Sequence, residues 1–448
     1  MKFLLLFAII LCRFHICLAN DEFKYPENFG WCTATAAHEV EGDNTNSDWW
    51  AWELIPGKIK DGDRSGKACD EWRRVKQDIA LMKNLGVNQY RFSVEWAKIE
   101  PEQGAWNKNA LSHYKREIEL LLESGIEPLV TLNHFTLPLW FAKLGGWANP
   151  NSPELFEKYV EKVVLWCGLP VKTWITFNEP VGSFAGGYIA GIVPPGRTDF
   201  FDLHASPLVN LLQAHANAYH LIHKFLDVPG SIVQVGMAHH LRVFEPKRAW
   251  NPLDLLAAKT VENLTNWDVP DALQTGVLKI RIPFFFRLTK KIHGLQGTQD
   301  YIGVNYYMRT MVAFTGKKPL MMDLSVKEGV PTTDVGSEIY PEGFYKTLMR
   351  IKNRYPGIPI LVTENGVADS KDRIRTDFIR THLNALERAM TDGAPVRNYC
   401  HWSLLDNFEW LEGFTARYGL YEMDYATQTR TLRPSGIFFS NYIQASHR

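Results

Sequence analysis

Apolar and polar positions follow two rhythms along the chain from residue 70 onward. In DEWRRVKQDIALMKNLG (70–86) apolar residues recur every three or four positions, the spacing of one helix face, and Gly86 ends the pattern. VNQYRFSVEW (87–96) then has the β-branched and aromatic content of a strand. The segment therefore predicts a helix followed by a strand.

This helix–strand unit is repeated. A second helix ends at Gly125 and is followed by the strand EPLVTLNH. A third begins at Ser152-Pro153-Glu154, which supplies a cap, a first-turn proline and a first-turn acid. After Gly168 it leads to the strand KTWITFNEP. Strands that alternate with helices predict parallel pairing, with both faces of the sheet buried.

Eight segments have the pattern of a buried strand. They are 29–36, 87–96, 127–134, 172–180, 232–240, 301–307, 359–366 and 397–407. No linker or charge run divides the chain, so we predict an α/β fold, a single-domain (β/α)8 TIM barrel with extended βα loops. Residues 191–200 and 311–340 are expected to form long loops beside the strand ends.

The N-terminus has the pattern of a secretory signal. MKFLLLFAIILCRFHICLAN combines an early lysine, an apolar run and a small-residue cleavage site at Ala19. We therefore expect residues 1–19 to be a signal peptide, 20–448 to be the barrel domain, and the protein to be secreted or periplasmic. No later segment is long and apolar enough to predict stable membrane insertion.

Composition narrows the function classes. Forty-nine basic and 49 acidic residues give no net charge, so nothing favours nucleic acid or an anionic membrane surface as a partner. The 15 Trp residues suit the C–H faces of sugars, although most such side chains belong to protein cores. Four cysteines follow residue 19, with no disulfide framework or metal-ligand spacing, so we expect buried thiols.

Polar residues gather at the predicted C-terminal strand ends, where such barrels place their active sites. Taken singly, each has an ordinary explanation: Glu364-Asn365-Gly366 suits a turn, Arg91 an ion pair, and His134 a position at the rim of the core. Their expected positions at the same end of one barrel favour a functional site over these separate explanations. Glu179 and Glu364 end the fourth and seventh strands, so we expect them to face each other across one mouth.

Two facing carboxylates allow few chemistries. A metal site requires more ligands at matching spacing, and His38 and His134 have no such partners. A phosphate site requires a Gly-rich loop before a helix, and none is found. Hydrolysis of an acetal requires only an acid and a nucleophile, so no metal and no cofactor is implied.

Seven segments extend over nearly the whole chain after residue 19: FGWCTATAAHEVEG, YRFSVEWAKIEP, TLNHFTLP, TWITFNEP, GVNYY, LVTENG and WSLLDNFEWLEGFTARYGL. In this order they resemble the successive blocks of glycoside hydrolase family 1, the β-glucosidase family. The resemblance implies a retaining β-glycosidase that removes terminal β-D-glucosyl, galactosyl or fucosyl-type residues from a small-molecule glycoside. By the same resemblance Glu179 is the acid/base and Glu364 the nucleophile.

The resemblance also assigns supporting roles. It implies that Arg91 keeps Glu364 ionised, that Tyr307 hydrogen-bonds it and that Asn178 holds the sugar 2-hydroxyl. Further substrate-binding positions implied in this way are Glu39, His134, Asn305, Trp402, Glu409 and Trp410, with Trp402 as the aromatic floor.

One departure concerns the sugar site. The family has Gln where this chain has Glu39, and an ionised Glu only accepts hydrogen bonds. Glu39 is then expected either to weaken binding somewhat while adding negative charge, or to select a sugar that bears an amine or another donor. We expect Glu39→Gln to improve hydrolysis of a simple aryl β-glucoside.

Other departures concern the chain elsewhere. VVLWCGLPVKTW is abbreviated before the fourth strand, so a trimmed helix end is expected there. The residues that bind a 6-phosphate in one branch of the family are absent, which favours an unphosphorylated substrate.

Two alternatives remain open at this point. The same residues would serve a transglycosidase with an alcohol or sugar acceptor, and a non-catalytic glycan-binding protein is possible on the same fold. The choice between glucoside and galactoside is open as well. The aglycone depends on the loops at 183–200 and 311–340.

Overall fold

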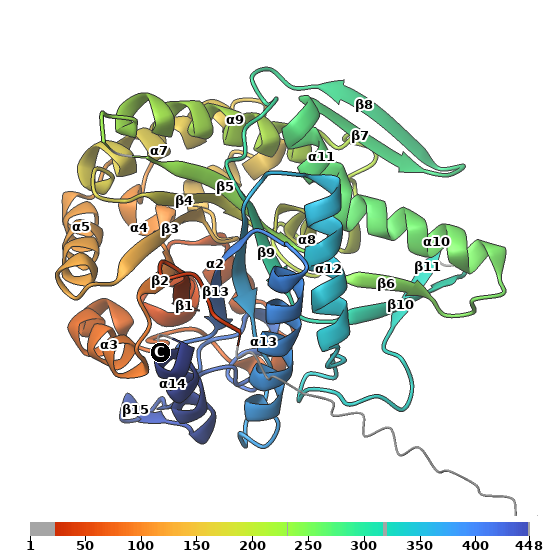
Figure 1. Ribbon diagram of the computed structural model, residues 1–448. Helices are drawn as coiled ribbons and strands as arrows, with labels where there is room; N and C mark the ends of the chain where they lie inside the picture. Colours follow the sequence, from red (N-terminus) through yellow and green to blue (C-terminus); the bar gives the residue numbers. More distant parts are fainter. Residues whose placement is uncertain (1–22, 231, 317–319, 447–448) are drawn as a thin grey trace, which may run out of the picture.

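The computed structural model describes residues 23–230, 232–316 and 320–446. The expected signal peptide lies outside these residues. Eight parallel strands close into a barrel in the order β1-β13-β12-β9-β5-β4-β3-β2, with helices around its outer face (Figure 1). All eight predicted strands and the predicted (β/α)8 fold are confirmed. The barrel strands are β1 (Gly30–Ala34), β2 (Gln89–Ser93), β3 (Glu127–Asn133), β4 (Thr173–Asn178), β5 (Gln234–His240), β9 (Ile302–Tyr306), β12 (Ile360–Asn365) and β13 (Val396–Trp402).

Amphipathic helices cover the barrel because each presents an apolar stripe to the strands. They are α3 (Glu71–Leu85), α5 (Lys108–Glu123), α7 (Ser152–Cys167), α9 (Ser206–Leu226), α11 (Asp268–Thr275), α12 (Pro341–Arg354), α13 (Arg375–Thr391) and α14 (Pro434–Ser446). The cap expected at Ser152 is displaced by one residue, since Asn151 is the N-cap and Ser152 is already helical. At the end of α7 the side chain of Cys167 is buried, whereas Trp166 is 37% exposed.

Short helices and additional strands decorate the βα connections. The short helices are α1 (Ala37–Val40), α2 (Asp48–Glu53), α4 (Trp96–Ile99), α6 (Leu139–Lys143) and α8 (Pro180–Phe184), and the longer α10 spans Pro252–Glu262. The strands outside the barrel are β6 (Val243–Pro246), β7 (Val277–Ile282), β8 (Phe286–Lys291), β10 (Arg309–Phe314), β11 (Met322–Ser325), β14 (Tyr421–Asp424) and β15 (Thr429–Leu432). The stretch 311–340 is therefore only partly a loop, because β10 and β11 pair within it and β10 joins β6.

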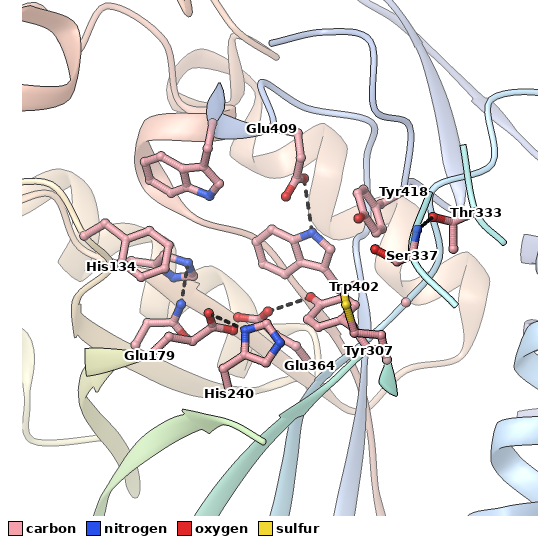
Figure 2. Close-up of a pocket in the computed structure, with 15 residues that line it drawn as sticks. His134, Glu179, His240, Tyr307, Thr333, Ser337, Glu364, Trp402, Glu409 and Tyr418 are labelled. Carbon is pink, nitrogen blue, oxygen red and sulfur yellow. Dashed lines mark hydrogen bonds and ion pairs between the residues drawn. The ribbon is translucent and has the colours of Figure 1, made fainter. Parts of the chain in front are cut away.

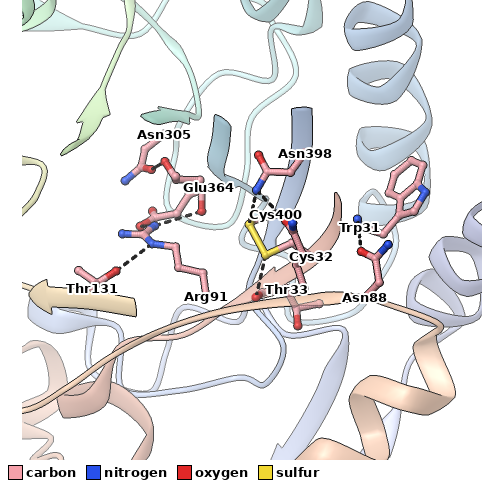
Figure 3. Close-up of a disulfide and its surroundings, with 12 residues drawn as sticks. Trp31, Cys32, Thr33, Asn88, Arg91, Thr131, Asn305, Glu364, Asn398 and Cys400 are labelled. Atoms are coloured by element: carbon pink, nitrogen blue, oxygen red, sulfur yellow. Dashed lines mark hydrogen bonds and ion pairs between the residues drawn. A yellow bond between two sulfur atoms is a disulfide. The ribbon is translucent and has the colours of Figure 1, made fainter. Parts of the chain in front are cut away.

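The expectation of four buried free thiols is wrong for one pair. Cys32 of β1 and Cys400 of β13 are register partners and form a disulfide (Figure 3). They lie in the apolar cluster that also contains Trp402. Spacing along the chain gave no sign of the pair, because 368 residues separate two strands that only barrel closure makes neighbours. Cys69 and Cys167 are buried free thiols, as expected.

Candidate active site

A pocket of about 170 Å³ opens at the C-terminal ends of the barrel strands (Figure 2). Eight of the predicted site residues line it, and they come from several different strands or the loops that follow them. These are His134, Asn178, Glu179, Tyr307, Glu364, Trp402, Glu409 and Trp410. Three other predicted residues, Glu39, Arg91 and Asn305, are fully buried and lie behind the pocket wall.

Glu364, at the end of β12, has a hydrogen-bond donor at each oxygen. Arg91 Nη1 lies 2.5 Å from Oε1, and the Tyr307 hydroxyl donates to Oε2 at 2.6 Å. Arg91 comes from the interior of β2, where its side chain is fully buried. Burial has the largest effect on the pKa of Glu364 and raises it, as does the charge of Glu179. Arg91 and Tyr307 lower this pKa by less, so the result is a pKa of about 7.

Glu179 follows β4 in a left-handed backbone conformation with φ 43°, immediately before Pro180. Asn305 Nδ2 donates to Oε1 at 2.8 Å, and His240 Nδ1 lies 2.9 Å from Oε2. Arg242 Nε donates to His240 Nε2 at 2.9 Å, so Nδ1 carries the imidazole proton and donates to Glu179. Burial alone would raise the pKa of Glu179, but His240, Asn305 and Arg242 together lower it to about 2.

The two carboxyl groups therefore titrate as a pair. Each raises the cost of ionising the other, because both are buried in one pocket and their charges repel. Between pH of about 2 and 7 the pair holds one proton. In the absence of substrate, the donors around Glu179 favour that proton on Glu364.

Asn178 connects the two halves of the site. Its Oδ1 accepts from Arg91 Nη2 at 2.6 Å and from Asn305 Nδ2 at 3.0 Å, while its Nδ2 donates to His134 Nε2 at 2.9 Å. Burial and the nearby Arg91 hold the pKa of His134 well below its usual value, so the ring is neutral and its proton is on Nδ1. That buried Nδ1 has no partner within the described part of the protein and is available to a ligand hydroxyl.

An aromatic wall closes another side of the pocket. His134 stacks against Trp402 and Trp410, with ring centroids 5.9 and 6.0 Å apart. Trp402 Nε1 donates to Glu409 Oε2 at 3.3 Å (Figure 2). Burial raises the pKa of Glu409 to about 8, so at neutral pH this carboxyl is an acid that both donates and accepts hydrogen bonds.

Glu39, on α1, differs from the expectation of an added negative charge. The residue is fully buried, and neither carboxyl oxygen has a hydrogen-bond partner among the described residues. Burial and then the charges of Glu409 and Glu364 raise its pKa well above the usual value. A protonated carboxyl donates and accepts as the family's amide does, so the physical difference from Gln is smaller than the sequence suggested.

Two residues that matter for Glu179 were missed by the sequence analysis. His240 is the last residue of a correctly predicted strand, so the strand-end argument already applied to it. Arg242 lies just beyond the strand, and only the folded chain shows that it fixes the tautomer of His240. The pocket also includes Phe135, Met308, Thr333, Ser337 and Tyr418.

The described residues contain no group of three or more His, Cys, Asp or Glu side chains arranged to hold a metal ion. In the same part of the chain, every helix is too short or too polar to span a bilayer.

Comparison with known proteins agrees with this geometry. The family model for glycosyl hydrolase family 1 matches residues 21–448. Beta-glucosidase A of Thermotoga maritima is 34% identical over 446 residues, which cover 94% of this chain and 98% of that protein. The solved structure of a β-glycosidase from Pyrococcus horikoshii has 39% identity and a TM-score of 0.86, covering 95% of this chain and 96% of that one. A β-glucosidase from T. maritima in complex with deoxynojirimycin has 32% identity and a TM-score of 0.87, covering 95% and 100%.

The barrel and its relatives define the class: this protein is a glycosidase, an O-glycosyl hydrolase with a β-glucosidase-like fold. Within that class, the chain belongs to glycosyl hydrolase family 1.

Proposed function

We propose that the protein is a retaining exo-β-glycosidase that removes terminal β-D-glucosyl or β-D-galactosyl residues by double displacement. The observation that carries this proposal is the pair of buried, differently perturbed carboxyl groups in one small pocket. Pairs of titratable groups with pKa values pushed apart are the usual signature of an acid and a base or nucleophile. The inhibitor bound to the T. maritima relative supports a small sugar ring as the group recognised.

In the first step, Glu364 is the nucleophile and Glu179 the acid. The Glu364 carboxylate attacks the anomeric carbon while Glu179 gives its proton to the glycosidic oxygen, so the C–O bond breaks and the aglycone leaves as an alcohol. Positive charge that develops at the anomeric carbon favours the anion at Glu364. Because the pair shares one proton, the same charge favours movement of that proton to Glu179.

In the second step, Glu179 acts as a base. Its carboxylate takes a proton from water, the water oxygen attacks the anomeric carbon and Glu364 leaves as a carboxylate. The donors that lower the pKa of Glu179 keep it ionised once the aglycone has left, so that the carboxylate is available to take the proton. Two inversions return the β configuration.

The remaining predicted residues are assigned to the sugar. Asn178 would bind a hydroxyl, as would Nδ1 of His134, which has no partner among the described residues, and Trp402 would offer a flat face to the ring. Glu39, Glu409 and Trp410 would complete recognition of the outer hydroxyls. Glu409 and Glu39 would act as neutral acids that donate as well as accept.

We also propose that the protein is exported. The signal-like pattern of residues 1–19 supports this, and so does the Cys32–Cys400 disulfide, because disulfides persist mainly in oxidising compartments.

Proton NMR of the first product tests the mechanism. Hydrolysis of an aryl β-glucoside, followed over the first minutes, should yield the β-anomer of the free sugar before mutarotation. Glu422→Gln, at an exposed carboxylate of β14 that does not line the pocket, serves as the control that leaves the outcome unchanged. Initial formation of the α-anomer would overturn the proposed double displacement.

A further inference from the structure

A group of large apolar side chains is exposed on the flank of the molecule built by α10, the tip of the β7–β8 hairpin and the β10–β11 connection. We call it the apolar flank; its residues are Leu253, Leu256, Phe284, Phe285, Phe314 and Met321, which line one groove of about 190 Å³. Phe284 is fully exposed, and half of Phe285 is in contact with solvent. A continuous patch of exposed apolar side chains is typical of a surface that contacts a partner or a membrane. Exposed apolar residues without such a role are scattered singly and do not gather around one groove.

The hairpin that carries this tip is strongly cationic. Residues 276–291, GVLKIRIPFFFRLTKK, contain five lysines and arginines and no acid. All five are exposed, and none forms an ion pair with a described residue. Figure 1 shows the hairpin projecting from the barrel wall, so these charges are presented away from the body of the protein.

The strand register places the cations together. Arg281 lies directly opposite Arg287, and Lys279 and Lys291 occupy the same face. Like charges directly opposite each other destabilise a strand pair. Among the described residues no carboxylate compensates them, so the arrangement is explained by an anionic surface outside the protein.

We propose that the apolar flank and the cationic hairpin dock the protein on the surface of an anionic phospholipid bilayer. Phe284 and Phe285 enter the boundary between headgroups and acyl chains, and the hairpin cations contact the headgroups. Apolar insertion and electrostatic attraction together give stable peripheral binding where either alone is marginal. The whole-chain charge balance concealed this surface, because the cations are concentrated in one 16-residue segment.

The charge pattern argues against a second copy of the chain as the occupant. A two-fold interface would place the flank against itself and bring two cationic hairpins together. A lipid surface meets both features at once, since its headgroups neutralise the cations and its acyl boundary accepts the phenyl rings.

The flank is also connected to the pocket. Phe285 and Phe286 contact Phe201, in the loop that follows β4, with ring centroids 4.9 and 5.0 Å apart. The segment after β11 reaches the pocket wall at Thr333 and Ser337. Docking through this flank would therefore hold the mouth of the barrel close to the lipid surface.

Vesicle co-sedimentation of the full chain tests the proposal. The vesicles are phosphatidylcholine alone or phosphatidylcholine with about 30% phosphatidylglycerol, at low and at high salt. The variants are Phe284→Ser/Phe285→Ser and Arg281→Gln/Arg287→Gln. Their matched controls are Leu169→Ser, an exposed apolar residue elsewhere, and Lys83→Gln/Lys143→Gln, exposed cations elsewhere.

We expect binding to the anionic vesicles that falls at high salt, because screening removes the headgroup attraction. Each flank variant should lose about tenfold or more in partitioning, while the controls, the hydrolysis of a soluble aryl glycoside and the melting temperature stay unchanged. Absence of vesicle binding, or equal binding by the flank variants, would overturn the proposal. So would a dimer in sedimentation velocity that Phe284→Ser/Phe285→Ser dissociates, since the flank would then be covered by a second copy.

Discussion

The variant Glu39→Gln tests whether Glu39 is protonated in the folded protein. In the folded protein, burial and the charges of Glu409 and Glu364 keep Glu39 protonated well above the pH at which a free glutamate ionises. The unfolded chain releases that proton at about pH 4.3. Between that pH and the folded-state pKa the native state binds the extra proton, so the stability contributed by Glu39 falls as pH rises. The glutamine side chain of the variant has no proton to lose and escapes this penalty.

The size of the effect follows from linkage. Each pH unit over which only the native state is protonated costs about 1.4 kcal/mol, so the stability of the variant relative to the wild type should rise with pH for as long as Glu39 stays protonated in the fold. Relaxation around the site reduces this figure, so the expected gain is below about 1.4 kcal/mol for each such pH unit and is larger at pH 7 than at pH 5. At pH 5 the two proteins should differ little, because neutral carboxyl and amide have similar shape and polarity.

Urea unfolding at pH 5 and pH 7 measures this directly. Glu422→Gln, at an exposed carboxylate, should show the same stability difference at both pH values. In parallel, kcat/KM on an aryl β-glucoside should rise in Glu39→Gln, with a larger gain at pH 8 than at pH 5. A stability difference independent of pH would refute the argument that Glu39 is held neutral. A lower kcat/KM would instead indicate selection for a sugar that bears a donor at this position.

Three further outcomes follow from the site and the barrel. Hydrolysis should be lost by about 10⁴-fold or more in Glu364→Gly without an external nucleophile, and retained activity would contradict its role as nucleophile. The kcat/KM of the wild type should fall as pH rises through about 7, where the Glu179–Glu364 pair loses its last proton. Arg242→Met should move that fall to higher pH, because it removes a cation that favours the Glu179 anion. An unchanged pH profile in the variant would exclude an influence of Arg242 on the pKa of Glu179. Replacing Cys32 and Cys400 together by Ala should lower the free energy of unfolding by up to about 6 kcal/mol, because the disulfide no longer closes a loop of 368 residues in the unfolded chain. Urea unfolding measures this difference. An unchanged unfolding midpoint would show that the disulfide contributes nothing to stability.

The barrel strands could be predicted because each is a short apolar run bounded by glycine or a capped helix. This signal lies within each segment, so it can be recognised without knowing which strands are neighbours in the fold. The hairpin β7–β8 carries a comparable local signal in VLKIRI, where apolar and charged residues alternate. No strand was predicted there, because this alternating run has no place among the eight buried strands of the barrel.

Features that depend on closure of the barrel could not be predicted from the sequence. Cys32 and Cys400 become neighbours only when the first and last strands pair. The protonation of Glu39 depends on the combined burial of the pocket, which no residue type reveals. In contrast, the candidate site positions were found because strand ends and family motifs both point to them.

The central claim is that Glu364 forms a covalent bond with the sugar while Glu179 exchanges the proton. A 2-deoxy-2-fluoro-β-glucoside with a good leaving group slows the second step and should trap the intermediate. Mass spectrometry of the digested protein should then find the fluoroglucosyl group on Glu364, in the peptide containing LVTENG. Label on Glu179 or elsewhere, or complete turnover with no labelled protein, would contradict the account.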